Sequence, residues 1–172
     1  PEVALRKRLD SDRFLWGKSE ERFFVEQGIP EGWSEEKFRR KVVECAKGYL
    51  GCQYRWGGKA ADGIDCSGVV FMVYLMNGVL IWRDADIREG YPMKAIWREG
   101  GGDVSGGGNG RRPGICCSGG GMWGCIWGDG RYLHCTGHER VFGCRVNSLQ
   151  RGDADFRKDL AEALKVVGSV FS

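Results

Sequence analysis

Tyr54-Arg55-Trp56-Gly57-Gly58 and, shortly after it, Gly63-Ile64-Asp65-Cys66-Ser67-Gly68 form the stretch that decides the fold of this chain. With the apolar run that follows, it predicts a glycine-rich loop and then a buried helix that starts at Cys66, with Asp65 as its N-cap, and ends at Asn77-Gly78. A helix N-terminus presents free N–H groups and the positive end of the helix dipole. Both favour the thiolate, which is the nucleophilic form of cysteine, so Cys66 is a candidate catalytic nucleophile.

Length and composition indicate one globular domain. The chain has 172 residues, of which 42% are hydrophobic, which is enough for a real core. The net charge of +3 is small and the basic residues are scattered among acidic ones, so nucleic acid is not an expected partner. Asn77-Gly78 interrupts the longest apolar run, so no membrane span is expected. The sequence begins at Pro1, and we take it as a fragment or processed chain, whose lack of a targeting segment does not indicate a compartment.

Hydrophobic periodicity gives a coarse map of elements in two parts. Residues 1–33 form an N-terminal segment, which we interpret as the end of an upstream domain, and residues 34–172 form the main domain. Ser34 is the expected N-cap of a helix whose apolar positions run to Leu50, with Gly51 as its stop. The remaining expected elements are the helix at 66–76 with Val69, Val70, Val73, Tyr74 and Met76 buried, a flexible loop at 100–121, strands at 125–127, 132–134 and 141–146, and a helix at 159–167.

The motifs at 54–58 and 63–68 resemble those of the NlpC-type peptidases, papain-like cysteine endopeptidases that cut peptidoglycan stem peptides. Further similar segments lie at 82–84, 128–134 and 146–149, so the resemblance covers residues 36–170 with a gap at 100–127. It implies an α+β papain-like fold in which N-terminal helices pack on a central antiparallel sheet. It also implies hydrolysis of the γ-D-glutamyl–diamino acid bond of stem peptides, in the cell envelope or outside the cell, with cytosolic recycling of wall peptides as the other setting.

The resemblance also assigns roles to individual residues. It implies Cys66 as the nucleophile and His134 as the residue that orients the catalytic imidazole. Tyr54 and Trp56 correspond to residues that line the pocket, against the simpler interpretation that an aromatic pair is core packing. Asp65 and Ser67, which flank the cysteine, are implied to contact polar groups of the substrate. No metal or cofactor is required, and we interpret Arg83-Asp84 as a surface ion pair without a catalytic role.

The histidine base of the family is missing from this chain. The pattern His-Val-Gly-x-Tyr-x-Gly should precede the hairpin at 128–130, and Met122 occupies the histidine position. The Pro-Gly-Asp-Leu signature expected upstream is missing as well. A cysteine at a helix N-terminus without a general base lacks efficient proton transfer.

The neighbouring reading frame contains both missing signatures. Residues 122–128 are encoded by ATG TGG GGN TGY ATH TGG GGN, and a start one nucleotide earlier gives NAT GTG GGG NTG YAT HTG GGG. These codons can encode His-Val-Gly-Leu-Tyr-Leu-Gly, with the valine and both glycines forced. The same shift over residues 112–118 can encode Pro-Gly-Asp-Leu-Leu-Phe. We therefore hypothesise that a segment within 100–127 is aberrant because it is frame-shifted, through a sequencing error or gene decay.

Three alternatives stay open at this point. In the first, Cys66 is a buried structural thiol, because most free cysteines are buried and unreactive. The chain is a non-catalytic or decayed family member that binds cell-wall peptides in the second. In the third it is a zinc-binding module, although the adjacent Cys116-Cys117 pair has poor spacing for zinc. The candidate zinc ligands would be Cys116, Cys117, Cys125, His134, Cys135 and His138.

Overall fold

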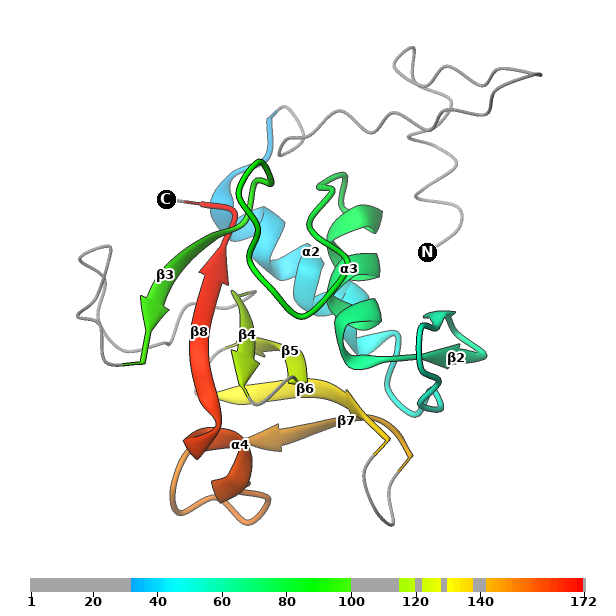
Figure 1. Ribbon diagram of the computed structural model, residues 1–172, viewed down its shortest axis with the longest axis vertical. Coiled ribbons are helices and arrows are strands. Elements are labelled where there is room, and N and C mark those ends of the chain that lie inside the picture. The colour runs from blue at the N-terminus through cyan, green and yellow to red at the C-terminus, as the bar shows by residue number, and fades with distance from the viewer. Residues whose placement is uncertain (1–31, 100–114, 120–121, 128–129, 138–141, 172) are drawn as a thin grey trace.

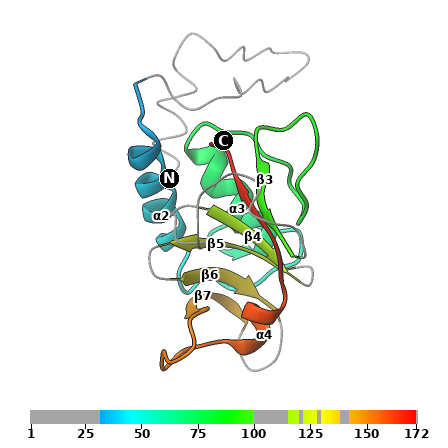
Figure 2. The same cartoon turned by 90° about the vertical axis from the view of Figure 1, so that its left-hand side faces the viewer.

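The computed structural model describes residues 32–99, 115–119, 122–127, 130–137 and 142–171. Two helices pack beside an antiparallel sheet, and the third, short helix precedes the last strand (Figures 1 and 2). The helices are α2 (Glu35–Lys47), α3 (Cys66–Met76) and α4 (Lys158–Glu162). The strands are β1 (Lys59–Ala60), β2 (Gly63–Ile64), β3 (Lys94–Arg98), β4 (Ile115–Gly119), β5 (Met122–Trp127), β6 (Arg131–Thr136), β7 (Gly143–Ser148) and β8 (Leu164–Ser169). The predicted α+β class is confirmed.

The main sheet has six strands in the order β3-β8-β4-β5-β6-β7, and all of its neighbours are antiparallel. The short strands β1 and β2 pair separately, just before α3. Helix α3 packs on β5 and β6, and α2 packs on α3. This arrangement places the N-terminus of α3 against the central strands of the sheet.

Two helices begin at their predicted caps. Ser34 Oγ accepts a hydrogen bond from Lys37 N at 3.2 Å at the start of α2. Asp65 Oδ1 accepts one from Gly68 N at 2.6 Å at the start of α3. The residues predicted to be buried on α3 are buried, because this helix lies between α2 and the sheet.

The expected end of the first helix is wrong by one turn. Helix α2 ends at Lys47 and is capped by Gly48, so Gly51 is not its stop. Leu50 lies beyond the helix and is 46% exposed. Gly51 instead has a positive φ of 82°, in a turn whose backbone N–H donates to Cys144 O at 3.0 Å. The apolar residue that continues the buried surface is Tyr49.

The C-terminal helix prediction is also largely wrong. The helix is confined to α4, and the following residues form β8 between β3 and β4. Val166 and Val167 pair with Arg98 and Trp97 of β3. An apolar run this short is compatible with the periodicity of a helix and with that of a strand. Here it forms a strand because its backbone pairs with β3 on one side and with β4 on the other.

Residues 100–121 are not a loop throughout, because β4 lies within them. Strand β4 pairs with β5 on one side and with β8 on the other. An ordered strand here counts against the interpretation of the whole segment as aberrant. Strand pairing uses backbone groups that both reading frames would supply, however, so only the codons test the frame-shift hypothesis.

The two faces of the central strands have different neighbours. Trp123, Cys125, Leu133 and Cys135 belong to the core formed with α2 and α3. Ile126 and Tyr132 lie in a second apolar cluster with Val167. Because side chains alternate along a strand, Met122, Gly124 and His134 lie on the same face as Tyr132.

Candidate active site

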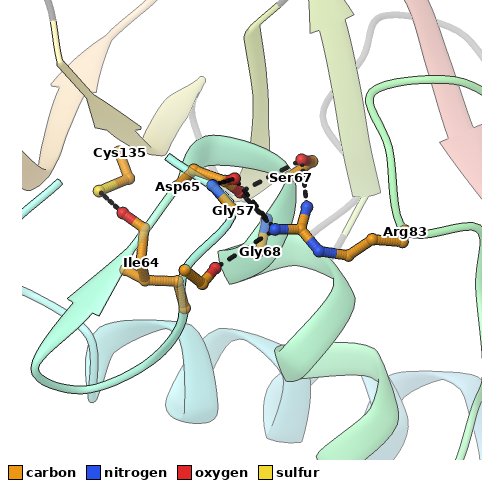
Figure 3. A network of polar contacts seen from close by, with 8 residues as sticks. Gly57, Ile64, Asp65, Ser67, Gly68, Arg83 and Cys135 are labelled. Atoms are coloured by element: carbon orange, nitrogen blue, oxygen red, sulfur yellow. Dashed lines mark hydrogen bonds and ion pairs between the residues drawn. The ribbon is translucent and has the colours of Figure 1, made fainter. Parts of the chain in front are cut away.

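Cys66 is the first residue of α3, as predicted, and Asp65 fixes this turn. The Oδ1 atom of Asp65 caps the helix at Gly68 N, and its Oδ2 atom accepts from Gly57 N at 2.7 Å (Figure 3). The glycine-rich loop and the helix N-terminus are therefore held by one carboxylate. Gly68 suits this close approach because a Cβ there would lie 2.4 Å from Gly58 O.

The helix N-terminus does not by itself make Cys66 a thiolate. Burial raises the pKa of the Cys66 thiol and is the largest effect. Hydrogen bonding by the Trp123 and Ser67 backbones lowers this pKa, and the charge of Asp65 raises it further. The expectation of a lowered pKa is therefore wrong, because desolvation of the charged form outweighs the helix end. The thiol needs a base to take its proton.

The position implied for that base lies at the start of β5. The hydrogen bond that the Trp123 backbone offers to Cys66 places this strand start at the thiol. Gly124 pairs directly with His134, so Met122 lies diagonally from His134 on the same face of the sheet. Met122 is half-buried, and its thioether does not accept a proton at neutral pH.

His134 is held in one orientation by β7. It is 1% exposed, and its Nε2 lies 2.9 Å from Asn147 Oδ1. Asn147 Nδ2 donates to Asp155 O at 3.3 Å, which leaves Oδ1 as the acceptor for His134 Nε2–H. The Tyr132 ring stacks on the imidazole at 5.4 Å between centroids. His134 therefore presents its other nitrogen, Nδ1, as an acceptor.

The Nδ1 atom of His134 is buried and receives no hydrogen bond from any of the described residues. Burial is the main cause that lowers the pKa of His134, and the neighbouring Arg157 and Arg145 add to it. A neutral imidazole with one locked N–H and one free acceptor is suited to receive a hydrogen bond from a second imidazole. This geometry fits the orienting role predicted for His134.

Asn147 is a site residue to which the sequence analysis gave no role. It lies in a segment that carries the resemblance, but its relation to His134 depends on the pairing of β6 with β7. Arg145 is directly opposite His134, and Asn147 follows two residues later on the same face. The spacing of residues in the sequence does not define the register of β6 and β7, so it could not predict the contact between Asn147 and His134.

Arg83 belongs to the Cys66 region and is not in a surface pair with Asp84. Its Nη2 lies 3.0 Å from both oxygens of Asp65, and its Nη1 donates to Ser67 Oγ at 2.6 Å. Ser67 Oγ donates in turn to Asp65 Oδ1 at 3.2 Å. Both oxygens of Asp65 thus already accept from protein donors, and the roles of Asp65 and Ser67 in substrate binding stay predictions.

The two aromatic residues of the first motif differ in their surroundings. Tyr54 is half-buried under Gly137, where a Cβ would lie 2.5 Å from the ring. Burial raises the pKa of Tyr54, and Cys66 and Asp65 raise it further, so the ring lies near the candidate nucleophile. Trp56 is 87% exposed and is therefore not core packing. The pocket-lining role of both residues stays a prediction.

The described residues contain no group of three or more histidine, cysteine, aspartate or glutamate side chains that would hold a metal ion. His138 and the side chains of Cys116 and Cys117, which the zinc interpretation needs, lie outside the described set. Among the helices of the described ranges, none has the length and apolar character needed to cross a membrane.

Comparison with known proteins identifies the family. Residues 51–153 match the NlpC/P60 family, so the chain belongs to the NlpC/P60 family. It is 39% identical over 142 residues to Dipeptidyl-peptidase 6 of Lysinibacillus sphaericus, covering 81% of this chain and 47% of the relative. It is 35% identical over 63 residues to Gamma-D-glutamyl-L-lysine dipeptidyl-peptidase of Bacillus subtilis (strain 168), covering 36% of this chain and 21% of the relative. The chain thus spans half or less of these relatives.

Solved structures share the fold. An NlpC/P60 family protein from Bacillus cereus is similar with a TM-score of 0.54 at 20% identity, over 82% of this chain and 41% of that one. The peptidoglycan hydrolase RipB from Mycobacterium tuberculosis is similar with a TM-score of 0.55 at 18% identity, over 99% of this chain and 81% of that one. These similarities confirm the papain-like fold that the sequence motifs predicted.

Proposed function

We propose that this chain is the catalytic domain of a cysteine peptidase that hydrolyses peptidoglycan stem peptides at the γ-D-glutamyl–diamino acid bond. The observation that carries the proposal is that Cys66, at the N-terminus of α3, lies at the start of β5, and that the adjacent strand β6 holds a buried His134 whose Nδ1 is an open acceptor. Both relatives are named as dipeptidyl-peptidases, and the name of the Bacillus subtilis relative specifies γ-D-glutamyl-L-lysine. We propose the cell envelope or the space outside the cell as the setting of this activity, with cytosolic recycling of wall peptides as the other setting.

The mechanism starts with attack of Cys66 Sγ on the amide carbonyl. Backbone N–H groups at the start of α3 stabilise the oxyanion, and collapse of the intermediate releases the amine and leaves a thioester. Water then attacks the thioester, which releases the carboxylate and returns Cys66 to its thiol form. Each step needs a proton carrier beside the sulfur, and an imidazole at position 122 would lie there with His134 to orient it.

Met122 favours a second candidate function, a domain that binds wall peptides without cleaving them. A thioether at the base position supplies no proton acceptor to the Cys66 thiol, whose pKa is raised by burial. The fold and the loop around Cys66 would still offer a peptide site. The two candidates agree in binding and differ in turnover by the chain as it stands, so turnover of a wall peptide that Cys66→Ser abolishes separates them.

The experiment compares turnover of a γ-D-glutamyl-L-lysine peptide by the chain as it stands, by Met122→His and by Met122→Gln. We expect a gain on the order of 10²-fold or more for Met122→His, because general base catalysis typically contributes 10²–10⁴-fold. Met122→Gln, which is polar but not basic, should show no gain. Adding Cys66→Ser to Met122→His should abolish turnover.

A second variant covers the case in which a single histidine at position 122 does not pack correctly among the existing neighbours. It replaces residues 113–118 and 122–128 by the peptides that the neighbouring frame can encode, and it should be at least as active as Met122→His. If both variants fold and bind the peptide but release no product, the binding function is supported and the peptidase proposal is wrong.

A further inference from the structure

Arg83 connects three segments around the candidate nucleophile. Its guanidinium contacts both oxygens of Asp65 and the hydroxyl of Ser67 (Figure 3). It also donates to the carbonyl of Gly58 at 3.3 Å. These partners lie in the glycine-rich loop, at the cap of α3 and in its first turn. Arg83 lies in the segment after α3, so its contacts connect that segment to the N-terminus of the helix.

The position of Arg83 is well sheltered for a charged residue. The side chains of Arg83 and Asp65 are 22% and 9% exposed. A single guanidinium nitrogen, Nη2, lies 3.0 Å from both oxygens of Asp65, and this charge-assisted contact fixes the carboxylate in orientation as well as in charge. The orientation matters here, because the same carboxylate caps α3 and binds Gly57 N.

The charge matters because Asp65 is the neighbour of Cys66. Burial opposes ionisation of Asp65, but hydrogen bonds from Arg83 and from the Gly68 backbone outweigh it and hold the pKa of Asp65 below its usual value. An ionised carboxylate beside a thiol disfavours the thiolate, and a cation on that carboxylate cancels much of this effect. Among the described residues, the Cys135 and Tyr54 side chains also interact electrostatically with Cys66.

We infer that Arg83 is a positioning residue for Cys66: it holds Asp65 in its capping orientation and cancels the Asp65 charge beside the sulfur. The inference rests on the proposed function only in taking Cys66 as the nucleophile. It assigns to Arg83 no contact with substrate.

The test measures the rate of Cys66 alkylation by iodoacetamide as a function of pH, with the labelled site identified by peptide mass spectrometry. Alkylation reports the thiolate without any turnover, so the result is independent of whether the chain is an active peptidase. The variants are Arg83→Gln, Arg83→Lys, Asp65→Asn and the double variant Arg83→Gln/Asp65→Asn. The control is Arg88→Gln, which removes an exposed arginine that pairs with Asp86.

We expect Arg83→Gln to raise the apparent pKa of Cys66 by about one unit, which lowers the alkylation rate about tenfold at neutral pH. Arg83→Lys keeps the charge and should cause a smaller change. The double variant should return close to the original profile, because it removes both charges. Arg88→Gln should leave the profile unchanged.

Two results would overturn the inference. One is an unchanged profile in folded Arg83→Gln, and the other is a shift of equal size in Arg83→Gln and in the double variant, which is what a merely structural role would give. If Arg83→Gln does not fold, Asp65→Asn decides, because an unopposed Arg83 should lower the Cys66 pKa and speed alkylation. Unchanged or slower alkylation in Asp65→Asn would then refute the inference.

Discussion

At the scale of single residues, burial is the effect that sets the chemistry of this site. A helix N-terminus contributes about 0.3–1 kcal/mol to a nearby negative charge. Burial shifts a pKa by several units in extreme cases, with each unit equal to about 1.4 kcal/mol. Burial therefore exceeds the helix-end effect at Cys66, where the pKa is raised, and it also dominates at His134, where the pKa is lowered.

The buried His134 should make stability depend on pH. Its folded-state pKa lies below that of the unfolded chain, so the unfolded chain takes up the proton first and acidification favours unfolding. Above about pH 6.5 this histidine costs no stability. Below it the free energy of unfolding should fall by up to about 1.4 kcal/mol per pH unit, until the folded-state pKa is reached.

Urea unfolding at about pH 7.5, 6.5 and 5.5 measures this slope in the unchanged chain and in His134→Gln. The glutamine variant keeps a polar group at this position and should lose most of the slope. Arg157, Arg145 and Asp159 also act on His134 and are identical in both proteins. Equal slopes in the two proteins would show that His134 does not titrate as described.

At the scale of elements, local signals located helix starts better than helix ends. Ser34 and Asp65 were both readable as caps because each side chain reaches a backbone N–H three residues along the chain. The end of α2 and the strand β8 depend on what packs beside them. Tyr49 is buried although it lies beyond the helix, and Val167 is placed by its pairing with β3 and β4.

The two caps should differ in strength. Ser34→Ala removes one cap hydrogen bond near the surface and should cost about 1 kcal/mol of unfolding free energy. Asp65→Ala removes a cap and also leaves the largely buried Arg83 without its carboxylate, for a total of about 3 kcal/mol. Chemical denaturation of both variants under one condition gives the comparison. A cost for Asp65→Ala no larger than that for Ser34→Ala would contradict the linked role of Asp65.

At the scale of the whole molecule, the sheet joins segments that lie far apart in the sequence. Strand β8 lies between β3 and β4 (Figure 1). Arg39 Nη2 on α2 donates to Ser169 Oγ at 3.1 Å near the end of β8. The segment containing β4 and β5 lies at the centre of this sheet. A change of reading frame there would alter the active-site face while leaving the chain on either side in register.

The gene sequence should show the frame-shift directly. If the neighbouring frame is the ancestral one, the Gly121 codon ends in C and the Cys125 codon ends in T, which gives histidine and tyrosine. The codons of Arg112, Pro113 and Gly114 should end in C, G and G. Resequencing this region reads all five third positions, and codons that cannot encode these residues would refute the hypothesis.

The sequence by itself determined the family and the helix that carries the candidate nucleophile, because these depend on residues that are neighbours in the chain. A helix cap, a cysteine and an apolar run are recognised from their local spacing, without knowledge of how the rest of the chain folds. Only the tertiary structure decided that Arg83 binds Asp65, that Asn147 locks His134, and that residues 115–119 and 164–169 are strands. Those facts depend on strand register and burial, which arise from packing between segments distant in sequence and leave no mark in local spacing.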